Sequence, residues 1–484
     1  MNFDSIGFAA FCILAIVVLN FAHSYRARMR AITTLNLIFL STFFATPLAA
    51  VPFAVFVVCG FVAVRSAHCV SGRGLAGILA LTVLAFAWMK QYSLIDFLPS
   101  LPFAFVAVGV SYLFFRIVHL AVDVHQQAIR APTIAEYLSY TLCFLTFVSG
   151  PVQRYGDFKQ QLQTPSKIET PTVLHHALSR VIWGFFLVGV VSHITMWAFS
   201  RIEREVVANM GEGTVNVRLA GIFAAAAVAF FVHLYISFSG YMHIVIGMGK
   251  LCGINISENF SRPYACKNFL EFWTRWNITV SEWFKFYIFN PLLKQLYSRW
   301  PQKNKVALIG AIAFFVTFML MGIWHGTTGI YVVYGAMLGL GAVVNKQYQL
   351  SATAQLGKQG YKDLCGRPWY IALCRATTLS YVAVALTCLW MTPTHAHLFA
   401  TPASLFVMLA AFAFLVSALF SVAYFGYWAG KLSRKIHAPS AQTIAIFSLE
   451  PWLAPGWTAV KISIVFVMIN VAGGAAPEFI YKAF

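Results

Sequence analysis

Long apolar windows with no charged side chain, or a single one, recur along the chain, separated by a few polar stretches. They span residues 6–22, 31–64, 75–89, 101–115, 137–148, 181–200, 219–249, 306–324, 328–345, 371–391, 405–428 and 460–472. The second window is long enough for two passes, with a break expected near Pro47 and Pro52. Since a crossing helix needs about 20 apolar residues, the pattern predicts an all-α polytopic membrane protein with roughly 11–13 transmembrane or re-entrant helices.

The chain is expected to form one domain, because it contains no internal repeat, low-complexity tract or Gly/Ser-rich linker. This single membrane-embedded domain covers 1–484, with core motifs in 100–345 and C-terminal helices in 370–484. Long polar insertions occupy 116–136, 153–180, 201–218, 250–305 and 346–375. Ionisable groups are costly inside a membrane. Functional residues are therefore expected in these insertions or at isolated ionisable positions within the apolar windows.

The composition excludes a soluble globular protein, and the positions of the basic residues predict which parts of the chain face the cytoplasm. The 484 residues are 60% hydrophobic and 10% charged, with a mean hydropathy of +0.74, whereas soluble domains carry roughly a quarter charged residues. The 34 basic and 15 acidic residues give a net charge of +19. Membrane proteins concentrate bases in cytoplasmic loops beside anionic lipid, so nucleic-acid binding is not inferred. The cluster of Arg26, Arg28 and Arg30 is predicted to lie in the cytoplasm, with the N-terminus outside, and Lys431, Arg434 and Lys435 form a second cytoplasmic candidate.

Cysteine and the N-terminus add two expectations. The absence of a basic region before the first apolar window argues against a cleaved signal peptide, so the first helix is expected to stay. The cysteines are odd in number and form neither a CxxC pair nor a cluster at metal-ligand spacing, so we expect no disulfide framework and no metal site. The nine are Cys12, Cys59, Cys69, Cys143, Cys252, Cys266, Cys365, Cys374 and Cys388.

The segment NFLEFWTRWNITVSEWFKFYIFNP, residues 268–291, does not fit a plain bundle of crossing helices. Its apolar residues recur every three or four positions, which predicts one continuous amphipathic helix. Glu271 with Arg275, and Glu282 with Lys285, can pair on its polar face. Such a helix lies in the membrane interface or enters the membrane against protein. An interfacial anchor carrying three tryptophans explains the pattern equally well, but the amide of Asn277 favours a functional site.

His325, in MGIWHGTTG, is the second unusual position. It is the only side chain in 306–345 that titrates near neutral pH, and these 40 residues are too long for one pass. They must fold back, and Gly322, Gly326 and Gly329 place the helix break near His325. A lone histidine at a membrane turn is often structural, yet an ionisable group inside a membrane is also a functional hypothesis.

Four motifs in order resemble the membrane-bound O-acyltransferase family. They are VGVSYLFFRIVHLAVDV from residue 108, FVSGPVQRYGDF from 147, YISFSGYMHIVIGMGKLCGINISENFSRPY from 235, and EFWTRWNITVSEWFKFYIFNPL followed by MGIWHGTTGIYVVYGAMLGLG; the terminal PEFIYKAF also fits. The chain is most similar to the bacterial cell-envelope branch, which includes alginate O-acetyltransferases and the D-alanyl transfer protein of teichoic acid. Two positions depart from that branch: Trp276 is followed by Asn277 where His is usual, and His243 stands where the alginate enzymes commonly have an acid.

The resemblance implies acyl transfer from a thioester to a hydroxyl. A neutral imidazole suits a general base, so His325 is predicted to take the hydroxyl proton. Asn277 is predicted to donate to the oxyanion or to position the acceptor. No Cys or Ser lies in a recognisable nucleophile setting, so direct transfer is expected. The remaining predicted substrate- or donor-binding residues are Arg154, Arg275, Trp276, Trp324, Tyr241 and Tyr334, although helix-end charge, pairing with Glu271 or aromatic packing explains them too.

The resemblance further implies a location in the bacterial plasma (inner) membrane and a donor presented from the cytoplasm. No bound cofactor is expected; the co-substrate is an acyl thioester of coenzyme A or of carrier-protein phosphopantetheine. An acidic acyl carrier protein would be steered by a basic face. The implied acceptor is an envelope polysaccharide or glycolipid. Acetyl is the first choice of acyl group and D-alanyl the alternative. The resemblance is also compatible with a periplasmic or extracellular partner protein. A transporter or flippase of an envelope precursor and a membrane scaffold remain the rival classes.

Overall fold

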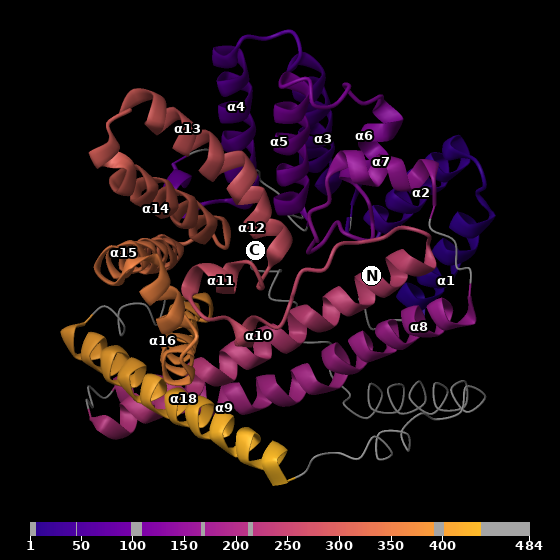
Figure 1. Ribbon diagram of the computed structural model, residues 1–484. Coiled ribbons are helices and arrows are strands. Elements are labelled where there is room, and N and C mark those ends of the chain that lie inside the picture. The colour runs from indigo at the N-terminus through magenta and orange to yellow at the C-terminus, as the bar shows by residue number, and fades with distance from the viewer. Residues whose placement is uncertain are drawn as a thin grey trace.

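The computed structural model describes residues 6–44, 46–97, 109–165, 170–211, 216–391 and 401–436. Within these ranges the chain is helical and contains no strand, only an isolated bridge between Phe260 and Trp276 (Figure 1). The α-helices are α1 (Ile6–Phe21), α2 (Tyr25–Ser41), α3 (Pro47–Ser66), α4 (Gly72–Lys90), α5 (Val110–His125), α6 (Ile134–Thr141), α7 (Tyr155–Gln163), α8 (Pro171–Phe186), α9 (Ser192–Gly211), α10 (Val217–Leu251), α11 (Phe269–Trp273), α12 (Ile278–Phe284), α13 (Asn290–Arg299), α14 (Val306–Trp324), α15 (Ile330–Cys365), α16 (Pro368–Leu386) and α18 (Pro402–Ile436).

Seven of the described helical segments are long and apolar enough to cross a membrane. The chain is therefore an all-α polytopic membrane protein, as the apolar windows predict. α8 and α9 are joined by the π-helix η2 (Leu187–Val191) into one such segment. The seven segments are Pro47–Ser66, Gly72–Lys90, Pro171–Met210, Val217–Leu251, Val306–Trp324, Pro368–Leu389 and Ser404–Trp428.

The 35-residue helix α10 is the centre of one layer of the molecule. The long helices α8, α9 and α18 pack against it (Figure 1). Small residues allow the close approach: a Cβ on Gly184 of α8 would lie 2.6 Å from the carbonyl oxygen of Gly240 in α10. At the far end, the Arg28 guanidinium donates to the carbonyl of Cys252 at 2.9 Å, and the Asn20 amide to that of Leu251 at 2.8 Å. The N-terminal helices are thus fastened to the end of α10.

α14 and α15 form an antiparallel hairpin, which confirms that residues 306–345 fold back. Gly322 of α14 lies directly against the backbone of Gly335 in α15, leaving no room for a Cβ. The turn occupies the few residues after Trp324, where the three glycines of MGIWHGTTG predict it. α15 then continues to Cys365 with a kink at Gly357 (φ 69°).

Four boundaries differ from those predicted. The break in window 31–64 falls just before Pro47, but Pro52 lies inside α3. α6 ends at Thr141, so 137–148 is not a crossing helix. α5 continues to His125 through the first half of the insertion predicted at 116–136, and α15 runs on to Cys365 through the insertion predicted at 346–375, so both polar stretches begin as continuations of helices.

The difference in 116–136 arises because a charged side chain can be buried in a helix when its N–H groups have hydrogen-bond acceptors. Arg116 in α5 is fully buried and donates to the carbonyl oxygens of Tyr140, Thr141 and Thr146 at 2.8–3.0 Å. Three carbonyl acceptors offset much of the cost of desolvating a guanidinium. The predicted window 460–472, the terminal motif and residues 101–108 lie outside the described residues.

Candidate active site

His325 directly follows the last residue of α14 and packs against two aromatic rings. Its ring centroid is 4.8 Å from that of Trp324 and 5.4 Å from that of Tyr334, which meets it edge-on from α15. Trp324 and Tyr334 are themselves buried. The structure therefore brings together three of the predicted site residues, with His325 only partly buried between two buried rings.

The hydrogen bond of His325 fixes its tautomer. The ring nitrogen Nδ1 lies 2.6 Å from the carbonyl oxygen of Met321, one turn earlier in α14. A carbonyl oxygen only accepts, so Nδ1 must carry the proton. In a neutral imidazole this makes Nε2 the unprotonated nitrogen, which is the atom a general base uses.

Asn277 breaks the segment that was predicted to be one continuous helix. α11 ends at Trp273, and α12 begins only at Ile278, with Asn277 between them in the left-handed conformation (φ 45°, ψ 51°). The prediction of a single helix over 268–291 is wrong here. Asparagine is one of the few residues that adopts this conformation readily, and a polar partner from another loop replaces the missing helical bonds.

That partner is Asn259, 18 residues earlier. Its backbone carbonyl accepts from the N–H of Ile278 and its side-chain Oδ1 accepts from the N–H of Thr279, both at 3.0 Å. Its amide nitrogen donates to Oδ1 of Asn277 at 3.0 Å. Because Oδ1 of Asn277 is engaged as an acceptor, the N–H groups of Nδ2 are the part of this buried side chain that can stabilise a negative oxygen.

A chain of ring contacts links the two helix breaks. Trp324, next to His325, packs on Phe115 of α5 with centroids 4.9 Å apart, and Phe115 packs on Trp283 of α12 at 4.4 Å. The indole N–H of Trp283 donates to the Phe115 carbonyl at 3.1 Å. α12 and α14, which carry Asn277 and His325 at their ends, are therefore held by the same residue of α5.

The other predicted site residues lie in different surroundings. Trp276 is buried and stacks on Phe272 at 5.5 Å within an aromatic cluster, and Tyr241 is fully buried in α10. Arg275 pairs with Glu271 at 2.8 Å. Arg154 is exposed, with its guanidinium 4.2 Å from the centre of the Phe286 ring. Core packing or local pairing accounts for the contacts of Trp276 and Arg275, while Arg154 stays a prediction for the donor entrance.

Sequence reasoning missed a group of polar residues on α5. His119 Nε2 lies 3.3 Å from Asp123 Oδ2, and the hydroxyl of Tyr287 donates to Asp123 Oδ1 at 3.0 Å. Residues 116, 119 and 123 share one helical face, which is a detectable signal inside a stretch taken for a polar insertion. In the part of the chain that the structure describes, no three His, Cys, Asp or Glu side chains form a group able to hold a metal.

The structure is that of a polytopic membrane protein with a buried amide, Asn277, and a histidine, His325, at helix ends, and a comparison of sequences identifies its family. The sequence model of the membrane-bound O-acyltransferase family matches residues 31–371. The chain belongs to this family. The matched range includes every predicted site residue.

The chain is also similar to individual bacterial proteins. It is 28% identical over 270 residues to the teichoic acid D-alanyltransferase of Streptococcus thermophilus, and 27% identical over 292 residues to that of Bacillus subtilis. It is 26% identical over 270 residues to a probable alginate O-acetylase of Pseudomonas fluorescens. These alignments cover 55%, 60% and 55% of the chain, and 64%, 70% and 49% of the three relatives' own lengths.

Proposed function

We propose that the protein is a membrane-embedded O-acyltransferase of the bacterial plasma membrane. It moves an acyl group from a cytoplasmic thioester, of coenzyme A or of carrier-protein phosphopantetheine, to a hydroxyl of an envelope polysaccharide or glycolipid. The observation that carries the proposal is the bond from His325 Nδ1 to the Met321 carbonyl, since it prepares Nε2 as a base. Family membership and the names of the relatives support it.

In the proposed reaction the hydroxyl oxygen attacks the thioester carbonyl while Nε2 of His325 takes its proton. The new C–O bond forms, negative charge develops on the carbonyl oxygen, and the Nδ2 group of Asn277 donates to it. When the C–S bond breaks, the thiolate leaves and receives the proton from the imidazolium. No acyl-enzyme is needed, and His325 ends the cycle neutral.

Acetyl remains our first choice of acyl group and D-alanyl the alternative. The teichoic acid D-alanyltransferase of Bacillus subtilis is covered over 70% of its length, against 49% for the probable alginate O-acetylase, which gives the alternative its own support. Mass spectrometry of envelope glycans from cells with and without the protein distinguishes them, because an acetyl ester adds a different mass from a D-alanyl ester.

The general-base assignment is tested with His325→Ala in purified protein supplied with donor and acceptor. We expect acyl transfer to fall by about 10²–10⁴-fold, the usual contribution of general-base catalysis. The matched control is His68→Ala, because His68 is exposed and its hydrogen bonds join it to neighbours in the chain, the Arg65 carbonyl and the Cys69 thiol. Transfer at the wild-type rate by His325→Ala would overturn the assignment. Flux of a glycan precursor through liposomes in the absence of any donor would favour a transporter instead.

A further inference from the structure

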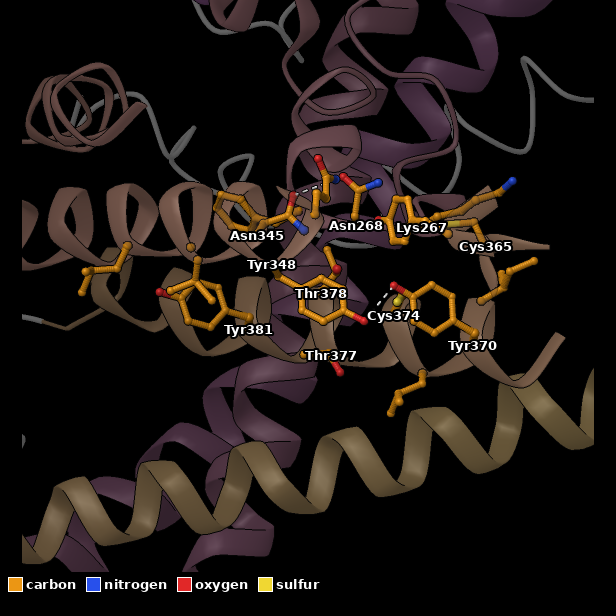
Figure 2. A pocket seen from close by; sticks show the side chains of 18 residues that line it. Lys267, Asn268, Asn345, Tyr348, Cys365, Tyr370, Cys374, Thr377, Thr378 and Tyr381 are labelled. Carbon is orange, nitrogen blue, oxygen red and sulfur yellow. Dashed lines mark hydrogen bonds between the residues drawn. The ribbon is translucent and has the colours of Figure 1, made fainter. Parts of the chain in front are cut away.

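A cavity of about 490 Å³ lies between α15, α16 and the start of α11 (Figure 2). It is separate from the two helix breaks, since its lining includes none of the predicted site residues. Its volume lies in the range of small-molecule sites, about 300–1,000 Å³. Much of the wall is apolar and is formed by Phe269, Leu340, Val344, Ile371, Leu373 and Tyr381.

The cavity opens on a surface that carries exposed apolar side chains. Leu340, Val344 and Leu373 line it and are nevertheless 52%, 65% and 38% exposed. α16 forms one wall and belongs to a crossing segment. Leu373 lies on this crossing segment, and an apolar side chain exposed on a crossing helix contacts acyl chains, so the wall formed by α16 borders the bilayer.

One side of the cavity is polar. Lys267, Asn268 and Asn345 lie along it, as Figure 2 shows, and Tyr348 and Tyr370 point toward each other with their hydroxyls 3.1 Å apart. An apolar chamber with polar groups and an ammonium at its edge matches an amphiphile that has an acyl chain and a charged headgroup.

Among the described residues that line the cavity, the one charged side chain is the basic Lys267, which favours an anionic headgroup, and further bases lie in the neighbouring part of the chain. Residues 346–375 contain five bases, Lys346, Lys358, Lys362, Arg367 and Arg375, and only one acid, Asp363. Arg375 donates to the carbonyl of Ala265 at 3.5 Å, two residues before Lys267, which brings one of these bases close to the polar side of the cavity. Clustered bases next to a crossing helix attract anionic lipids.

We propose that the cavity between α15 and α16 binds an anionic phospholipid from the bilayer, with an acyl chain against Leu340 and Val344 and its phosphate at Lys267. The proposal does not depend on the acyl-transfer function.

The test uses full-length protein in nanodiscs that contain equal amounts of phosphatidylglycerol and phosphatidylcholine, and mass spectrometry of the lipid retained after mild detergent extraction. Val344→Trp and Thr377→Trp enlarge side chains on opposite walls, and each is expected to reduce retained phosphatidylglycerol about tenfold. Ser417→Trp is the matched control on the exposed surface of α18, and it is expected to retain lipid like the wild type. Lys267→Gln is expected to reduce the preference for phosphatidylglycerol over phosphatidylcholine.

Unchanged retention of phosphatidylglycerol by both tryptophan variants overturns the proposal. Displacement of the retained lipid by acetyl coenzyme A also overturns it, because the cavity would then take the acyl donor. Circular dichroism of each variant identifies a folding failure, and Lys267→Gln, at an exposed position, keeps the test valid if a tryptophan variant misfolds.

Discussion

At the scale of single residues, the two predicted catalytic side chains are each oriented by a partner that a linear sequence does not reveal. His325 is held by a carbonyl one helical turn away, and Asn277 by an amide from a loop 18 residues distant. The glycines around His325 predict its helix break because their flexibility is a local property. No periodic signal marks Asn259, since its contacts with Asn277 and Thr279 depend on how two loops meet.

The role of the Asn277 amide is tested with Asn277→Asp. This change keeps the shape and the acceptor oxygen that faces Asn259 but removes the N–H donors. We expect acyl transfer by purified protein to fall by about 10²-fold or more, the size of a lost oxyanion donor. Asn277→Gly accommodates the left-handed backbone without an amide and should lose a similar factor. Asn277→His should retain more activity than either, because an imidazole N–H can donate and histidine tolerates this backbone conformation. Equal rates for all three would contradict the oxyanion role.

At the scale of elements, segment 268–291 illustrates what periodicity can and cannot predict. The three- and four-residue spacing correctly identifies the buried faces, since Trp273, Val280 and Trp283 are all buried. It does not reveal that Asn277 has a positive φ angle, because one residue outside the helical region leaves the average spacing nearly unchanged. Likewise, the charges of α5 resemble a polar loop until Arg116 is seen bound to three carbonyls.

The close contact of α14 with α15 gives a second prediction. In Gly322→Ala the new methyl group meets the Gly335 backbone, which cannot move away as a side chain can. Overpacking of this kind costs about 1–3 kcal/mol, so a lower midpoint of thermal unfolding is expected in detergent. Gly310→Ala is the control in the same helix, because nothing lies within 4 Å of its Cβ position. Equal unfolding midpoints for the two variants would show that the hairpin can open without cost.

A third prediction concerns pH and the junction of α2, α6 and α7. Burial acts to raise the pKa of Glu136, but hydrogen bonds from Lys159, Thr133 and Tyr25 outweigh it and hold the pKa at about 2. A carboxylate with a depressed pKa stabilises the fold above its unfolded pKa of about 4.3 and loses this effect as pH falls toward the folded value. Glu136→Gln should therefore lower the unfolding midpoint at pH 7 and have a smaller effect at pH 3. A difference that grows on acidification would contradict this account.

At the scale of the whole molecule, the positive-inside rule and the length of α10 together predict the topology. Arg28 lies in the first turn of α2, where the cluster of bases predicts the cytoplasmic side, and it binds the C-terminal end of α10. The 35 residues of α10 span about 52 Å, more than the roughly 30 Å hydrocarbon core. His23→Cys should therefore react with an impermeant maleimide only from the cytoplasmic side, and Val217→Cys only from the outside, in a background without the exposed Cys59 and Cys69. Labelling of both from one side would contradict this topology.

The contact between Arg28 and Cys252 also constrains how the protein is assembled. The two residues are 224 positions apart in the chain. α1 and α2 are synthesised before α10, so the Cys252 carbonyl does not exist until residue 252 has been added. During that interval Nη1 of Arg28 can donate to the carbonyl of Leu19, its 2.9 Å partner in the folded protein, but Nη2 must donate to water or to lipid phosphates. α1 and α2 therefore make their final contacts only after α10 is complete.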